Sequence, residues 1–185
     1  MALVERAAAL VTAMPYDEEL DWLLDAARAD ALSLLGRNSE ADEIMRPLLA
    51  RAEPRSWREF WAATKTADIA LFDDRPGEAL ELYGRAMEVL RPYGSPMGEL
   101  IQADTIALAL SRLGRLDDAA LVVAICDVCH GELSWQPPGA LGEALRAACE
   151  ATGPERLAAA RRQAAALGLH GGLDRVRALA AGKEG

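Results

Sequence analysis

The chain has 185 residues, of which 51% are hydrophobic, and its 29 acidic side chains outnumber its 20 basic ones to give a net charge of −9. This length suits one domain with a sizeable core, and no apolar run approaches the roughly 20 residues that a membrane helix needs. Because an acidic protein repels phosphate backbones, the composition argues against direct nucleic-acid binding as well as against membrane contact.

The first residues predict an amphipathic helix over 1–16 and not an export signal. The chain starts without a basic segment, and apolar residues such as Leu3, Ala7 and Leu10 recur at helical spacing. Three cysteines in a chain without an export signal indicate reduced thiols. We therefore expect a cytoplasmic protein.

From residue 17 onwards, capping residues and helix breakers divide the chain into helices, about ten in all, with no strand pattern. Gly36 ends one helix, and Ser56 with Glu59 forms a Ser-x-x-Glu capping box at the start of another. Ser95 followed by Pro96 places a cap and a first-turn proline before a third. The pattern predicts an all-α protein.

One residue conflicts with this division. Pro47 falls within the helix that the pattern predicts over residues 39–52. A proline inside a helix costs about 3 kcal/mol, because it removes a hydrogen bond and its ring contacts the preceding turn. We expect this helix either to kink or to begin later than residue 39.

A turn followed by an alanine recurs three times at nearly constant spacing. The segments 35–41, 73–79 and 113–119 align on an arginine and on a final alanine, and these alanines are 38 and 40 positions apart. A period of roughly 20 to 50 residues is typical of stacked supersecondary units, each too small to bury its own apolar face. We therefore predict a solenoid of antiparallel helix pairs.

This repeat resembles the tetratricopeptide repeat, in which a helix pair has a small residue midway along its first helix and an alanine early in its second. Twelve positions before the three marked alanines lie Ala29, Ala67 and Ala107. The resemblance implies a single domain over 1–185, with a leading helix over 1–16, three helix-pair repeats over 17–131 and C-terminal helices over 132–185. The repeats are longer than the usual ~34 residues.

The alanine-rich C-terminal part is similar to the end of the repeat region in large bacterial ATP-binding transcriptional regulators of the LuxR type. The similar segments are 152–160, 166–169 and 173–180. The chain has no Gly-x-x-x-x-Gly-Lys phosphate loop, and no DNA-reading helix pair follows residue 181. The resemblance implies the interaction region of such a regulator, without the ATPase or the DNA-binding part.

If the helix pairs stack as in that family, the first helix of each pair lines a concave groove. We expect an acidic strip there that binds a basic or amphipathic peptide, with the aspartates steering the partner and Trp61 as the apolar anchor. An ordinary solvated face of an acidic protein is the alternative. The predicted partner-binding residues are Asp30, Ser33, Trp61, Thr64, Asp68, Asp104, Ser111 and Arg112.

Residues 126–130 read Cys-x-x-Cys-His, the spacing of covalent haem attachment. The missing export signal opposes haem, and so does the position of Cys126 and Cys129 on the inward stripe of a repeat helix. We interpret both thiols as small core residues. A zinc or redox site, with Cys149 and His170 as further ligands, is the alternative. We predict no metal and no cofactor.

Other catalytic signals are few. His130 and His170 occur without a Gly-x-Ser-x-Gly or His-Glu-x-x-His motif, so we predict no catalytic residue and no enzyme. The sequence predicts an interaction module that binds a protein or peptide, with an effector-sensing domain of a transcriptional regulator as the alternative. Self-association is a further expectation, because the ends of a solenoid expose apolar surface.

Overall fold

The computed structural model of the chain describes residue 6 and residues 18–133, 147–148 and 150–182. All regular elements in these ranges are helical, which confirms the all-α prediction, although the seven α-helices and one 3₁₀ turn are slightly fewer than the ten expected. The predicted leading helix over 1–16 lies almost entirely outside the described residues. The elements are α2 (Glu18–Leu34), α3 (Asn38–Arg51), α4 (Trp57–Phe72), α5 (Pro76–Leu90), η1 (Arg91–Tyr93), α6 (Pro96–Arg112), α7 (Leu116–Leu133) and α9 (Pro154–Ala180).

The three repeat turns share one backbone conformation. Gly36 and Gly114 have φ of 72°, and Asp74, at the matching position of the second turn, has φ of 56°. Glycine enters this left-handed region without steric cost, and aspartate is one of the few other residues that do so readily. In each turn the following arginine N–H reaches back five residues: Arg37 to Leu32 O (2.9 Å), Arg75 to Ala70 O (2.8 Å) and Arg115 to Leu110 O (3.0 Å). These are the hydrogen bonds of a Schellman helix end.

The six alanines that define the repeat are all fully buried. They are Ala29, Ala67 and Ala107 in the first helices of the three pairs, and Ala41, Ala79 and Ala119 in the second helices. A larger side chain would push close-packed helices apart, since protein interiors leave little free space. All six positions are therefore buried, as the predicted repeat register requires.

Two of the predicted caps are present, whereas the later helix start that Pro47 suggested is not. Ser56 Oγ accepts a hydrogen bond from Glu59 N–H at 3.1 Å, and Ser95 Oγ accepts one from the third residue of α6 at 3.3 Å. Helix α3 starts at Asn38 and continues without a break through Pro47. The proline is exposed, so the carbonyl that loses its usual donor lies on the solvent side of the helix.

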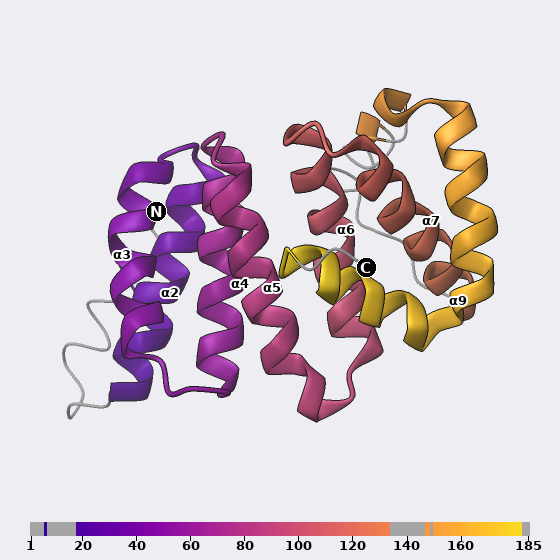
Figure 1. Cartoon of the computed structure of the whole chain (residues 1–185). Coiled ribbons are helices and arrows are strands. Elements are labelled where there is room, and N and C mark those ends of the chain that lie inside the picture. Colours follow the sequence, from indigo (N-terminus) through magenta and orange to yellow (C-terminus); the bar gives the residue numbers. More distant parts are fainter. Residues whose placement is uncertain (1–5, 7–17, 134–146, 149, 183–185) are drawn as a thin grey trace.

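Each helix from α2 to α7 packs against the next one along the chain, and α9 packs against α7 (Figure 1). Helix α9 bends at Gly168, where φ of 62° and ψ of −173° depart from helical values. Its second half contacts α6 and α5 as well, and Ala180 lies against Gly84 of α5. None of the described helices combines the length and the apolar content that crossing a membrane requires.

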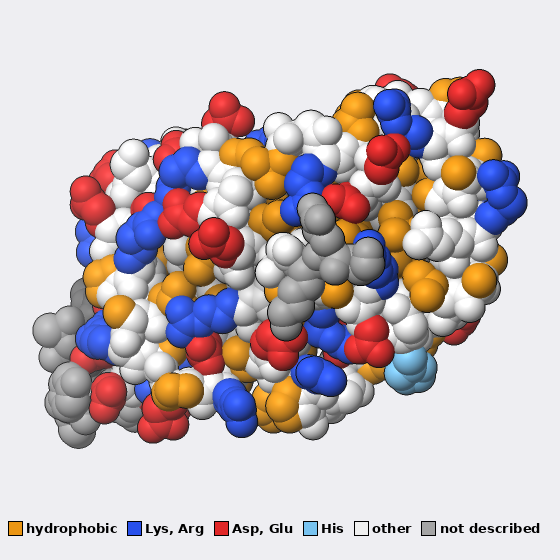
Figure 2. All heavy atoms as spheres, viewed as in Figure 1, with side chains coloured by type: hydrophobic (Ala, Val, Ile, Leu, Met, Phe, Trp, Pro, Cys, Tyr) orange, Lys and Arg blue, Asp and Glu red, His pale blue; other side chains and the backbone are white. Residues whose placement is uncertain are grey.

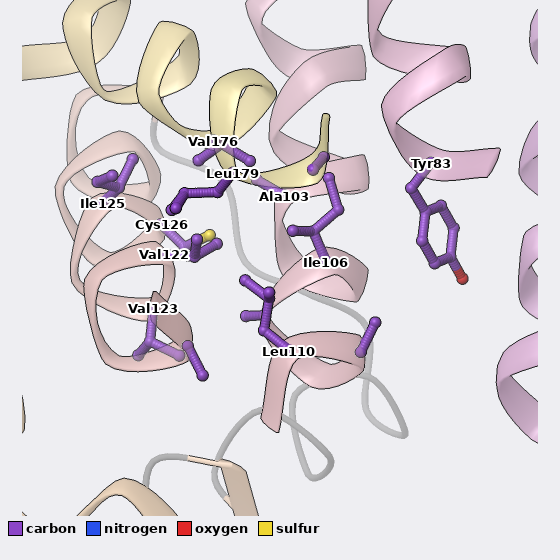
Figure 3. Close-up of a cluster of buried hydrophobic side chains, with 14 of the residues drawn as sticks. Tyr83, Ala103, Ile106, Leu110, Val122, Val123, Ile125, Cys126, Val176 and Leu179 are labelled. Carbon is purple, nitrogen blue, oxygen red and sulfur yellow. The ribbon is translucent and has the colours of Figure 1, made fainter. Parts of the chain in front are cut away.

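The buried side chains form two clusters, one joining α2 to α5 and the other joining α4 to α7 with α9. Figure 3 shows the second cluster, in which Val176 and Leu179 of α9 lie toward Ile106 of α6 and Cys126 of α7. Tyr83 of α5 belongs to the same cluster, and its hydroxyl points away from α9. That orientation places the hydroxyl at the site described next.

Candidate partner-binding groove

A cavity of about 340 Å³ lies between α4 and α6, and we refer to it as the α4–α6 groove. Helix α5 packs against both helices and holds them apart. Thr64 Oγ1 and Gln102 Oε1, 3.4 Å apart, join α4 to α6 directly. The lining residues are Thr64, Lys65, Asp68, Leu71 and Phe72 from α4, Tyr83 from α5, and Ile101, Gln102, Thr105 and Leu108 from α6.

The α6 wall is one row of side chains, Ile101, Thr105 and Leu108, spaced four and three residues apart. Residues at these spacings share a helix face, as do Asp68 and Phe72 on α4. Two apolar members of the walls remain accessible, because Phe72 is 66% exposed and Ile101 is 38% exposed. The groove therefore offers apolar surface that the rest of the described chain leaves uncovered.

A hydrogen-bonded pair forms the polar part of the groove. The Tyr83 hydroxyl donates to Asp68 Oδ1 at 2.7 Å, and the tyrosine is fully buried whereas the aspartate is half-buried. Burial raises the pKa of Asp68 above its ordinary value, and the hydrogen bond from Tyr83 offsets part of that rise. Burial, followed by the charge of Asp68, raises the pKa of Tyr83 well above 10, so the phenol remains a donor at neutral pH.

Lys65 connects the groove to two other predicted residues. Its Nζ lies 3.3 Å from Asp30 Oδ1 and 5.6 Å from the centroid of the Trp61 ring. Trp61 also packs edge-on against Trp22, with the ring centroids 5.4 Å apart. Asp30 is thus paired with a cation, and Trp61 is half-buried against its neighbours, outside the cavity lining.

The prediction that Asp104 faces the groove is wrong. Its side chain is 0% exposed and lies on the side of α6 that packs against α7, where Oδ2 is 3.2 Å from His130 Nε2. Positions 104 and 105 are both one turn before Leu108, but they differ by about 100° around the helix. Thr105 is the one that lines the groove. Burial raises the pKa of Asp104, and His130 lowers it in part.

The other predicted residues divide between the groove and its ends. Thr64 and Asp68 line the cavity. Arg112 lies at the far end of α6, where its Nη1 donates to the carbonyl of Leu71 and joins α6 to α4. Ser33 and Ser111 are half-buried near the ends of α2 and α6 and do not line the cavity. The acidic strip is therefore reduced to Asp68, with Asp30 paired beside it.

Sequence reasoning missed most of the apolar lining. Phe72 had a usable signal, since it lies four residues after Asp68 and so on the same face of α4. Ile101 is seven residues before Leu108, which also places the two on one face. No sequence spacing indicated Tyr83, because it belongs to α5, the second helix of a pair, and reaches the groove between α4 and α6.

Charges of both signs are mixed on the face of the molecule that Figure 2 shows. Among the surface ion pairs, Arg46 joins Glu78 at 2.6 Å and Arg75 joins Asp42 at 3.2 Å, linking α3 to α5. Exposed pairs of this kind contribute about 1 kcal/mol or less each. The net negative charge of the chain therefore does not make this face uniformly acidic.

Cys126 and Cys129 belong to the core, as interpreted from the sequence. Both thiols are free and buried. Burial raises the pKa of Cys126 well above its ordinary value and that of Cys129 to about 11, so both are protonated and unreactive at neutral pH. Within the described ranges, no three His, Cys, Asp or Glu side chains form a group that could hold a metal ion, and Cys149 lies outside those ranges.

No protein-family model matches the chain, and no curated protein or solved structure is significantly similar to it. The α4–α6 groove is therefore the feature of the chain that indicates a function. A cavity of this volume, with apolar walls and a few convergent polar groups, suits the side chains of a bound peptide or a small ligand.

Proposed function

We propose that the chain is a protein–protein interaction module, a TPR-like solenoid of helix pairs whose α4–α6 groove binds a peptide segment of a partner protein. The observation that carries the proposal is the presence, in one groove, of the accessible side chains of Phe72 and Ile101 and the hydrogen-bonded pair Asp68–Tyr83. Covering apolar surface contributes roughly 25 cal/mol per Å², and the polar pair supplies orientation.

Two further observations support this proposal. The consecutive packing of α2 to α7 is the order expected of a solenoid, and the shared geometry of the three turns is expected of repeats. The setting that we propose, a cytoplasmic module of a bacterial regulator, comes from the sequence resemblance. We propose no reaction for the chain.

Affinity capture from a lysate of the source organism tests the proposal. The parent is compared with a double variant, Phe72→Ser and Ile101→Ser, and with the control Leu167→Ser, which changes an exposed leucine of α9. We expect at least one protein that the parent and the control retain and the double variant loses. Equal retention by all three proteins would contradict the proposal.

Small-molecule sensing by the same groove is the second candidate, and the cavity volume favours it. About 340 Å³ lies within the range of roughly 300 to 1,000 Å³ that small-ligand pockets occupy. Native mass spectrometry of the purified parent would then show a bound compound that the Phe72→Ser, Ile101→Ser variant lacks. A parent mass equal to that of the bare chain would contradict this candidate.

A further inference from the structure

We infer that the α4–α6 groove selects a peptide that presents a Lys or Arg about one helical turn from a large apolar side chain, the cation pairing with Asp68 and the apolar group lying between Phe72 and Leu108. The inference rests on the proposed function and adds the chemistry of the partner.

The basic position follows from the surroundings of Asp68. Tyr83 donates to Oδ1, whereas within the described part of the chain no hydrogen bond reaches Oδ2. The neighbouring cation, Lys65, pairs with Asp30. A half-buried carboxylate in a mostly apolar groove therefore lacks a direct cationic partner, and a charge-assisted hydrogen bond is about twice as strong as a neutral one. Tyr83 also fixes the carboxylate in place, which reduces the cost of ordering it on binding.

The apolar position follows from the spacing along α4. Phe72 is four residues after Asp68, which corresponds to about 6 Å along the helix axis. Leu108 of α6 forms the opposite wall at this level, because the contact of Leu71 with Arg112 brings the last turns of α4 and α6 together. Ile101 lies toward the other end of the groove, next to the contact between Gln102 and Thr64. Side chains three or four residues apart on a helical peptide are separated by about 5 to 6 Å, so a basic and an apolar residue at that spacing match the two parts of the groove.

Other occupants match less well. An acidic peptide would bring a second negative charge to Asp68, and a wholly apolar one would bury the free oxygen without a partner, which costs free energy. Phe72 remains 66% exposed although it lines the cavity, so a ligand confined to the cavity would leave most of this ring uncovered. A peptide that continues over the rim covers it.

A peptide-display library of random 16-residue sequences, selected on the immobilised parent, tests the inference. Enriched peptides are synthesised with fluorescein and titrated by anisotropy against the parent, Asp68→Asn, Ile101→Ser and the control Glu43→Gln, an exposed carboxylate of α3. Asp68→Asn retains an oxygen that accepts from Tyr83, loses the charge and replaces the acceptor Oδ2 with an NH2 donor. Urea unfolding of each variant verifies that it is folded.

We expect enriched peptides to carry Lys or Arg three or four positions from Leu, Ile, Met, Phe or Trp. Asp68→Asn should weaken binding about tenfold or more, and Glu43→Gln should leave it within about twofold. Replacing the basic residue of the peptide by Gln should weaken binding to the parent by the same factor and have little further effect on Asp68→Asn, as coupled partners in a double-mutant cycle do.

The outcomes separate the inference from the proposed function. Peptides that lose affinity for Ile101→Ser but not for Asp68→Asn would overturn the inference and leave peptide binding in the groove intact. Peptides insensitive to both variants, or a library without any enriched sequence, would overturn both. A parent that forms a dimer in sedimentation, disrupted by Ile101→Ser, with no peptide bound, would identify a second copy as the occupant and would also overturn the inference.

Discussion

A carboxylate lies on each side of α6, and the two carboxylates differ in their access to solvent. On the groove side, Asp68 of the facing helix accepts a hydrogen bond from Tyr83 and is half-buried. On the core side, Asp104 is enclosed beside His130. Burial raises the pKa of both aspartates. Burial of a carboxylate is thus not what marks a candidate binding residue; access from solvent distinguishes Asp68 from Asp104.

Helices α7 and α9 are the physical reason for this difference. Helix α7 covers Asp104 and places His130 beside it. The second half of α9 packs against α6 and α7, and Arg177 forms an ion pair with Glu99 at the start of α6, both side chains being nearly buried. Within the described ranges, no equivalent helix covers the groove side. One face of α6 therefore became core, and the other remained available to a partner.

The largest effect is expected from breaking the ion pair that attaches α9 to α6. Arg177→Met should reduce the free energy of unfolding by about 3 to 5 kcal/mol, because it leaves the buried Glu99 without its cation. The double variant Glu99→Leu with Arg177→Met should recover much of that loss, and the control Arg175→Met should change little. Urea denaturation followed by circular dichroism measures all three. A single variant as stable as the parent would show that α9 does not depend on this pair.

Truncating one isoleucine on each side of α6 tests the comparison directly. Ile106→Ala should cost about 2 to 5 kcal/mol, since the side chain is fully buried in the α6–α7–α9 cluster. Ile101→Ala should cost less than about 1 kcal/mol, because this side chain is already partly exposed in the groove. Thermal and urea unfolding would give the two values. Similar losses at both positions would contradict the distinction between a core face and an open face.

A smaller loss is expected where α9 crosses α7. A Cβ atom at Gly172 would lie 2.7 Å from Cγ2 of Ile125, and the branched side chain of Ile125 has little rotamer freedom to move away. Gly172→Ala should therefore destabilise the protein by about 1 to 3 kcal/mol. Gly171→Ala is the matched control, with its nearest contact at 3.6 Å, and should be neutral or stabilising by up to about 1 kcal/mol. The reverse order of stabilities would show that α9 packs differently.

The smallest effect is a pH dependence on the groove side. Because the pKa of Asp68 is raised in the folded state, its contribution to stability is present below about pH 4 and is lost as pH rises through the folded-state value. The stability of Asp68→Asn relative to the parent should therefore increase between about pH 4 and pH 7. Asp104 is present in both proteins, so its titration contributes equally to both and does not change this difference. Urea unfolding across this range measures the difference. A constant difference would contradict the raised pKa of Asp68.

Local rules predicted the repeat well. Gly36 and Gly114 take the left-handed conformation that ends a helix, and Asp74 substitutes for glycine in the second turn. The fully buried alanines follow from the same register, since close helix packing admits only small side chains. The turns depend on neighbours within a few residues along the chain, and the positions of the alanines follow from the repeat period, so the sequence alone determined both.

The groove depended on tertiary structure. Along α6 eight of the eleven residues from Leu100 to Leu110 are buried, so its apolar pattern has too little contrast to indicate which side faces a partner, and Asp104 was assigned to the wrong side. Likewise Ala119 to Cys126 of α7 are all buried. Packing of α7 against α6 decided between Asp104 and Thr105, because His130 of α7 lies beside Asp104. The hydroxyl of Tyr83 reaches Asp68 only because α5 packs behind both walls. The sequence determined where the helices end and which small residues separate them; long-range packing decided which face stayed open, because burial depends on elements distant in the chain.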